Sequence, residues 1–124
     1  MTKKILLVDD EVAVLDLLSA TLATDDQYSL LLARNGDEAI SVCGRERPDL
    51  LILDVTMPGM DGYEVCRLLR KDPSTADIKV IMLTALTQDF DRQKAMEAGA
   101  DAYFTKPFSP SGLLEKVEEL LSVP

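Results

Sequence analysis

Residues 50–62 read LLILDVTMPGMDG, and this stretch decides the fold. Its apolar start, Leu50–Leu53, lacks the alternation of a strand that faces water and predicts a strand buried on both faces, as in a parallel sheet. Asp54 then lies at the carboxyl end of that strand, which is the edge where open α/β sheets bind ligands. Pro58, Gly59 and Gly62 end the strand and shape a loop. Asp54 alone could equally be an ordinary turn residue, so its role depends on the other strand ends.

The rest of the chain alternates apolar runs with helical patterns. Further strands are predicted over Lys4–Val8, Tyr28–Ala33, Ile78–Leu83 and Asp101–Thr105. Helices are predicted from Val12 to Leu22, from Asp37 to about Arg47, from Gly62 or Tyr63 to Lys71, from Asp89 to Ala98 and from Ser109 or Ser111 to about Leu121, with a break of the first helix at residues 24–27. Helical spacing predicts that these side chains turn inward: Val12, Leu15, Leu18, Leu22, Ala39, Ile40, Cys43, Val65, Leu68, Leu69, Phe90, Ala95, Met96, Leu113, Leu114, Val117, Leu120 and Leu121.

This alternation predicts an α/β fold in one domain that spans residues 1–124. We expect a doubly wound five-stranded parallel sheet in the flavodoxin-like order 2-1-3-4-5, with five helices on both faces. In that order the first and third strands are neighbours, and their carboxyl ends flank the crevice where the strand order reverses.

Composition excludes several classes of function. The net charge of −9 disfavours direct contact with nucleic acid or with an anionic membrane. The chain has no histidine, so it holds no histidine-dependent triad, histidine metal ligand or phosphohistidine. Cys43 and Cys66 form no CxxC motif and are predicted to be free thiols in a reducing compartment. No apolar run is long enough to span a membrane, and the expected location is the cytoplasm.

Chemically useful side chains follow four of the five predicted strands. Asp9 and Asp10 follow the first, Asp54 the third, Thr84 the fourth and Lys106 the fifth. Three carboxylates in one crevice repel one another unless a cation neutralises them, and hard oxygen ligands select Mg²⁺, Mn²⁺ or Ca²⁺. With an ammonium and a hydroxyl added, the edge can hold a phosphoryl group, which Asp54 can accept as an aspartyl phosphate.

Each of these residues also has an ordinary structural interpretation. Asp9 and Asp10 suit a helix N-terminus, Thr84 could cap the next segment, and Lys106 could be a solvated loop charge. Their coincidence at one edge of the sheet favours a functional site.

Several motifs carry a resemblance to a known family. They are VDDE at 8–11, LDVTMPGMDG at 53–62, LTA at 83–85, and AGADAY at 98–103 running into TKPF at 105–108. Together they cover essentially the whole chain, which resembles the receiver domain of bacterial two-component response regulators.

The resemblance implies roles for the residues at the expected site. Asp54 would be the phosphoacceptor. Asp9, Asp10, Asp54 and the backbone carbonyl of Thr56 would hold Mg²⁺, with Mn²⁺ as an alternative. Lys106 would pair with the phosphoryl oxygens.

The same resemblance implies a switch. The Thr84 hydroxyl would swing toward the phosphoryl group, and Tyr103 would turn inward into the space that it leaves. Pro58 and Gly59 would shape the loop after Asp54, and the bond from Lys106 to Pro107 would be cis.

The implied function is a phosphoacceptor receiver in a two-component phosphorelay. The donor would be a sensor histidine kinase or a phosphotransfer protein, and the readout an output domain or a downstream protein. The fourth helix, fifth strand and fifth helix would form the switching surface and a homodimer face. The domain would promote only its own phosphorylation and dephosphorylation, so it is not expected to be an enzyme. Residues 113–121 lack the Arg-rich ending of receivers with winged-helix DNA-binding domains, which weakens the case for an attached domain of that kind without excluding it.

Three other interpretations stay open. An aspartyl-phosphate phosphatase or phosphotransferase of the haloacid dehalogenase type would need a second Asp where Thr56 stands. A flavin- or nucleotide-binding module would need a phosphate-binding loop where the acidic run 9–11 stands. A non-switching docking pseudo-receiver is disfavoured by the presence of Asp54, Thr84 and Lys106 together.

Overall fold

The computed structural model describes residues 2–23, 26–86 and 88–122. The strands are β1 (Lys3–Val8), β2 (Tyr28–Ala33), β3 (Leu50–Leu53), β4 (Lys79–Thr84) and β5 (Ala102–Thr105). The helices are α1 (Val12–Leu22), α2 (Gly36–Glu46), α3 (Gly62–Lys71), α4 (Asp89–Glu97) and α5 (Pro110–Leu121). The predicted boundaries therefore hold to within one or two residues, whereas positions 24 and 25 of the predicted break after the first helix lie outside the described residues.

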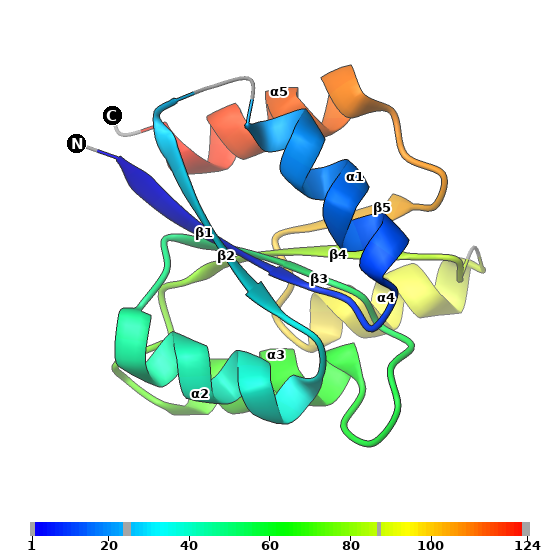
Figure 1. Cartoon of the computed structure of the whole chain (residues 1–124). Helices are drawn as coiled ribbons and strands as arrows, with labels where there is room; N and C mark the ends of the chain where they lie inside the picture. Colours follow the sequence, from blue (N-terminus) through cyan, green and yellow to red (C-terminus); the bar gives the residue numbers. More distant parts are fainter. Residues whose placement is uncertain (1, 24–25, 87, 123–124) are drawn as a thin grey trace.

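The strands form one parallel sheet in the order β2-β1-β3-β4-β5. Helices α1 and α5 cover one face, and α2, α3 and α4 cover the other (Figure 1). The predicted fold class and strand order are confirmed. Within the described part of the chain, no helix combines the length and the apolar character that crossing a membrane would need.

The central strand β3 separates two hydrophobic cores. Leu51 and Leu53 belong to the core under α2, α3 and α4, whereas Leu50 and Ile52 belong to the core under α1 and α5. All four side chains are at most 1% exposed. The apolar run is unbroken because helices cover both faces of the strand, as the sequence predicted.

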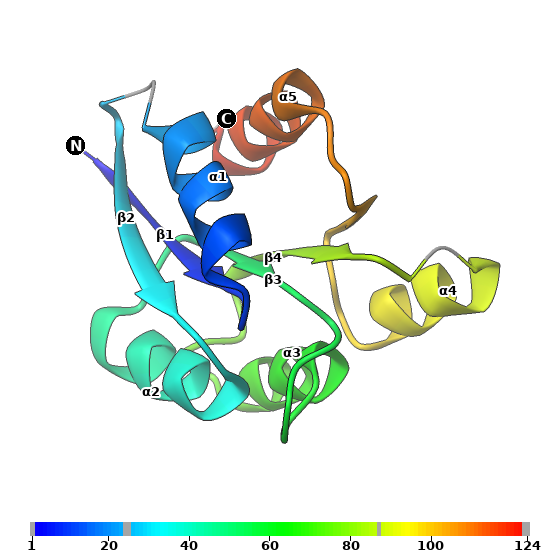
Figure 2. The ribbon, with the colours of Figure 1, turned by 45° about the vertical axis from the view of Figure 1, so that its right-hand side comes forward.

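The predicted inward faces of the helices are wrong at four positions. Val12, Leu68, Phe90 and Met96 are 50%, 39%, 66% and 50% exposed. Val12 and Phe90 lie in the first turns of α1 and α4, and α4 lies at the margin of the sheet, beside β5 (Figure 2). Helical spacing defines a stripe, but how much of that stripe faces the sheet depends on where the helix lies.

An unexpected clamp holds the far end of α4. The Arg70 guanidinium donates to the carbonyls of Gly99, Ala76 and Ile78 and forms an ion pair with Asp101 at 3.1 Å. Asp101, which the sequence placed in the fifth strand, lies just before β5 and accepts the Val80 amide at 2.8 Å. These bonds tie α3, β4 and the α4–β5 turn together at the edge opposite the predicted site.

Both cysteines are buried and free, as predicted, and should resist thiol reagents in the native protein. Burial raises the pKa of the Cys43 thiol to about 11 and also raises that of Cys66. Since the thiolate is the reacting form, we expect labelling of Cys43 by iodoacetamide at pH 8 to be about 100-fold slower than labelling of a free thiol. Labelling of Cys66 should also be slower, and both thiols should react in denaturant. Counting adducts by intact mass, with glutathione as the reference thiol, tests this. Rapid native labelling would contradict the buried positions.

Candidate functional site

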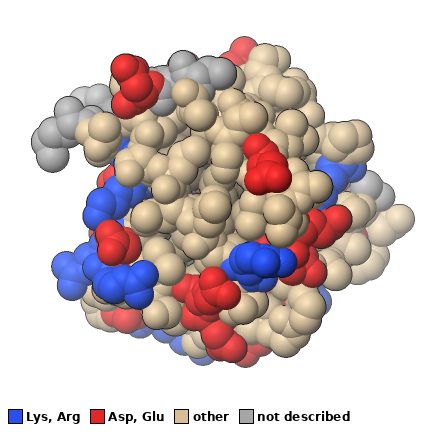
Figure 3. Space-filling view, viewed as in Figure 1, with Lys and Arg blue, Asp and Glu red and all other residues tan. Residues whose placement is uncertain are grey.

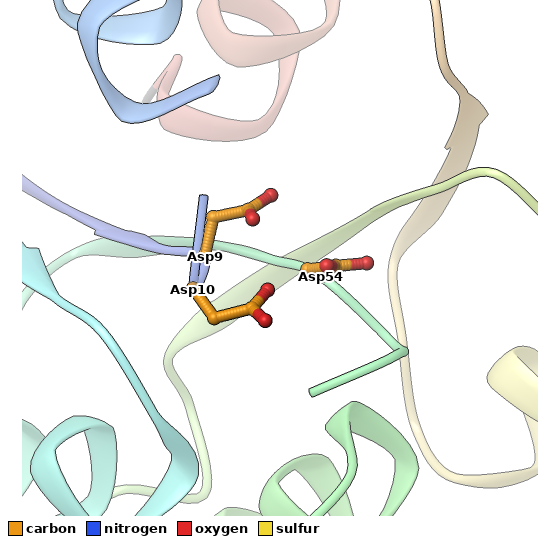
Figure 4. Close-up of side chains that lie close together, drawn as sticks. All are labelled: Asp9, Asp10 and Asp54. Carbon is orange, nitrogen blue, oxygen red and sulfur yellow. The ribbon is translucent and has the colours of Figure 1, made fainter. Parts of the chain in front are cut away.

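The carboxyl ends of β1 and β3 bring three carboxylates together. Asp9 and Asp10 follow β1, and Asp54 follows β3 directly. One carboxylate oxygen from each residue lies within 4.8 Å of the corresponding oxygens of the other two, and the three side chains point into one space (Figure 4). β1 and β3 are paired in register, Val8 beside Leu53, so the topology makes this meeting unavoidable.

Asp54 is held in place by backbone bonds on either side. Its amide donates to the Val8 carbonyl at 3.0 Å, which continues the sheet by one residue. Its Oδ1 accepts the Thr56 amide at 3.2 Å, so the loop begins with a turn around the carboxylate. The side chain is only 4% exposed. The predicted ligand role of the Thr56 carbonyl stays a prediction.

Lys106 reaches the same space from the end of β5. Its Nζ lies 2.9 Å from Asp9 Oδ2, 3.4 Å from Asp54 Oδ2 and 3.6 Å from Glu11 Oε1. Its own amide donates to the Thr84 carbonyl at 2.8 Å, which anchors the lysine to the end of β4. The bond to Pro107 is cis, as expected from the resemblance.

The electrostatics of the cluster reflect an excess of negative charge. Burial, followed by repulsion from Asp9, raises the pKa of Asp54 to about 6, although Lys106 and the Thr56 amide oppose that rise. Burial lowers the pKa of Lys106, but its hydrogen bond to Asp9 and the charges of Asp54 and Asp9 outweigh burial and leave that pKa raised. The single ammonium charge of Lys106 thus neutralises only part of the negative charge of the carboxylates.

The donor set fits a divalent cation. Carboxylate oxygens are the ligands that Mg²⁺ and Mn²⁺ prefer, and the described residues place no cysteine or histidine among them. An open hollow of about 610 Å³ borders Asp10 and is lined by Pro58, by Gly59 at a φ of +79° and by the first turn of α2. The edge can therefore hold a cation, and the hollow leaves open space beside Asp10.

Thr84 and Tyr103 are joined through the backbone of Leu86. The Leu86 amide donates to the Thr84 hydroxyl at 3.3 Å, and the Tyr103 hydroxyl donates to the Leu86 carbonyl at 2.7 Å. Thr84 is fully buried, and Tyr103 is 7% exposed with its ring turned inward. A change at Thr84 can thus reach Tyr103 through one residue, although the motion of either side chain stays a prediction.

Sequence reasoning missed two members of the site. Glu11 entered the sequence analysis only as part of the VDDE motif and the acidic run 9–11, yet its carboxylate approaches Lys106, and its amide donates to Asp9 Oδ1 at 2.9 Å. The bridging role of Leu86 had no signal in the sequence, because it uses only backbone atoms.

Lys106→Met should tighten Mg²⁺ binding about fivefold at pH 8, where Asp54 is ionised. The ammonium repels a second cation among the same carboxylates, and removing one unit charge a few ångströms away changes the binding free energy by about 1 kcal/mol. Isothermal titration with MgCl₂ measures this, and Lys116→Met, on α5 and ion-paired with Glu119, is the control. Equal or weaker binding by Lys106→Met would contradict this account.

Comparison with known proteins gives consistent matches. The family model of the response regulator receiver domain matches residues 5–118. The chain is 42% identical over 121 residues, 98% of its length, to the alkaline phosphatase synthesis transcriptional regulatory protein PhoP of Bacillus subtilis (strain 168), of which this match covers 49%. Among solved structures, the Vibrio cholerae chemotaxis protein CheY4 superposes with a TM-score of 0.89, 32% identity and coverage of 98% of this chain and 100% of that one.

A third match bears on the metal. The receiver domain of the sensor histidine kinase PA1611 of Pseudomonas aeruginosa PAO1 superposes with a TM-score of 0.87 and 28% identity, covering 97% of this chain and 98% of that one. That structure has a magnesium ion coordinated in its active site cleft.

Proposed function

The chain belongs to the response regulator receiver domain family, and we propose that it accepts a phosphoryl group on Asp54 from a phosphohistidine of a sensor histidine kinase or a phosphotransfer protein. The observation that carries this proposal is the meeting of Asp54, two further carboxylates and the Lys106 ammonium at one edge of the sheet. As a receiver domain, the chain is a signalling domain rather than a conventional enzyme.

In the proposed transfer, an Asp54 carboxylate oxygen attacks phosphorus, the bond from phosphorus to the imidazole nitrogen breaks, and the imidazole leaves with the electron pair. Asp54 must be ionised to attack, which its pKa of about 6 allows at neutral pH. Lys106, 3.4 Å from Asp54 Oδ2, is placed to pair with the transferred phosphoryl oxygens. Mg²⁺ held by Asp9, Asp10, Asp54 and the Thr56 carbonyl would neutralise charge on the phosphoryl oxygens.

The proposed response starts at Thr84. The phosphoryl group brings about −1.5 to −2 charges into the site and can draw the Thr84 hydroxyl and the Lys106 ammonium toward it. The hydrogen bond from the Leu86 amide to the Thr84 hydroxyl would then break. Because the Tyr103 hydroxyl donates to the Leu86 carbonyl, this change would reach Tyr103. The affected surface would comprise α4, β5 and α5, where Phe90 and Met96 lie exposed.

The wider setting is also a proposal. The chain spans about half the length of PhoP. We propose that residues 1–124 act as a single receiver unit in the cytoplasm and pass the signal to an output domain or a downstream protein. The surface of α4, β5 and α5 would contact that partner or a second receiver in a homodimer.

Phosphorylation by a small donor tests the proposal. Intact-mass spectrometry after incubation with acetyl phosphate and MgCl₂ is expected to show one labile phosphoryl adduct per chain, and EDTA should prevent it. If no adduct forms, uptake of beryllofluoride, followed by ¹⁹F NMR, distinguishes a strict need for a kinase from a site that binds no phosphoryl group. Failure of both would refute the proposal, and multiple turnover of a phosphomonoester would favour a phosphatase.

A further inference from the structure

The strand β2 forms one margin of the sheet and carries no charge over its six residues, YSLLLA. The other margin, β5, has four residues, and the carbonyl of its Tyr103 accepts a hydrogen bond from Arg92 at 3.4 Å. A long, uncharged edge strand is a template for pairing with another strand, because its outward backbone groups have no neighbour in the sheet. The two margins thus differ in length and in hydrogen bonding, and β2 is the margin better suited to pair with an added strand.

The alternation of the backbone shows which groups of β2 face outward. The carbonyls of Gln27 and Ala33 accept amides from β1 and the residue that follows it, at 2.8 and 3.2 Å. Odd-numbered positions therefore face β1, and the even-numbered Leu30 and Leu32 turn their N–H and C=O groups to the open edge. In the ranges that the structure describes, neither residue has a hydrogen-bond partner for these groups.

The side chains at these positions are also apolar and accessible. Leu32 is 53% exposed, and Leu30 is partly buried against the core under α1 and α5. β2 runs across the front of the view in Figure 1, and the same view in space-filling form shows a broad area free of charged side chains in the middle of this face (Figure 3).

The charges that flank β2 indicate which partner strand would fit its open edge. Asp26 precedes the strand and Arg34 follows it, and both are exposed. In an antiparallel pair of two β2 strands, outward-facing residues must stand opposite outward-facing residues. If Leu30 faces Leu30 of the second copy, Asp26 of each copy stands opposite Arg34 of the other. Oppositely charged cross-strand pairs are favourable, so the strand is complementary to itself in this register.

We infer that the open edge of β2 is a self-association surface, to which a second copy of this chain adds its own β2 in antiparallel orientation with Leu30 at the two-fold axis. The resulting sheet is continuous through both copies. This surface lies at the margin of the sheet opposite β5. The charge of −9 on each copy opposes association, so the dimer is weak and reversible at physiological ionic strength.

Sedimentation equilibrium of the unmodified protein tests this inference. The weight-average mass should rise with concentration toward that of a dimer. Leu32→Lys should raise the dissociation constant about tenfold, because it places a charge in the pairing edge. Leu17→Lys, on α1, is the matched control, since Leu17 is also 53% exposed and should leave the constant unchanged. A monomer at every concentration, or equal effects of the two variants, would overturn the inference.

Charge exchange tests the register. Asp26→Arg and Arg34→Asp should each weaken the dimer about fivefold, because each loses two symmetric pairs, and the double variant should recover the original constant. A Phe90→Lys variant on α4 should have no effect. Loss of the dimer in that variant, or no recovery in the double variant, would contradict the pairing.

Cross-linking provides a second, independent readout. Opposed residues of a hydrogen-bonded antiparallel pair have Cα atoms about 5.5 Å apart, within the span of a disulfide. Leu30→Cys should therefore form a covalent dimer on oxidation with diamide, whereas Ser29→Cys, also on β2 and exposed, should not. The native cysteines are buried and need no replacement. Cross-linking of Ser29→Cys in preference to Leu30→Cys would refute the proposed register.

Discussion

Asp54→Asn is expected to abolish labelling by acetyl phosphate completely while leaving the fold intact. The amide nitrogen replaces one carboxylate oxygen without changing the shape of the side chain, but the amide cannot act as the attacking nucleophile at neutral pH. The Thr56 amide keeps an acceptor at Oδ1, so the loop after β3 should hold its position. Intact mass after incubation with acetyl phosphate and MgCl₂ measures the effect. Stoichiometric labelling of the variant would show that another residue is the phosphoacceptor.

The same substitution should stabilise the protein at neutral pH in EDTA, by about 2 to 3 kcal/mol. The pKa of Asp54 is raised from 3.8 to about 6, so the folded state favours its protonated form, and ionisation destabilises the fold. The increase in the free energy of unfolding caused by Asp54→Asn should be absent below pH 4, grow as the pH rises and be complete above about pH 6.

Urea unfolding of the original protein and of Asp54→Asn at pH 4, 5, 6 and 7.5 gives that pH dependence directly. Asp77→Asn, which removes an exposed carboxylate elsewhere, serves as the control for net charge. A stability difference that does not change with pH would show that ionised Asp54 is not the source of strain in the site.

Gly62→Ala is expected to destabilise the fold by about 3 kcal/mol, or to lower the melting midpoint by roughly 10 °C. Gly62 begins α3, and its amide donates to the Val55 carbonyl at 2.9 Å. A Cβ here would lie 2.5 Å from the Asp54 carbonyl oxygen and 2.8 Å from the Val55 Cα, and neither backbone atom can move freely. The start of α3 must shift away from the end of β3 and from Asp54, which follows that strand.

A matched control lies on the next helix back. Gly44 in α2 is exposed, and a Cβ at that position would meet no atom within 4 Å. Gly44→Ala should therefore stabilise the protein by about 0.5 to 1 kcal/mol through helix propensity alone. Thermal unfolding followed by circular dichroism compares the two variants. Equal stability of Gly62→Ala and Gly44→Ala would show that the backbone near Gly62 can accommodate a Cβ without loss of stability.

Local sequence determined most of the fold. Continuous apolar runs can be satisfied only by strands buried on both faces, and their alternation with helices restricts the sheet to a parallel, doubly wound order. Since the carboxyl ends of such strands share one edge, the meeting of Asp9, Asp10, Asp54 and Lys106 followed from their positions after the runs. The glycines and prolines of the loop after β3 likewise act through their own backbone geometry.

Tertiary structure alone decided how the parts contact one another. The exposure of Val12, Leu68, Phe90 and Met96 depends on how each helix packs on the sheet, which a helical stripe does not encode. The clamp of Arg70 on Asp101 joins elements 31 residues apart, and the bridge from Thr84 to Tyr103 uses backbone atoms of Leu86. The charge state of Asp54 is likewise tertiary, because desolvation and the nearby Asp9 and Lys106 exist only once β1, β3 and β5 share an edge.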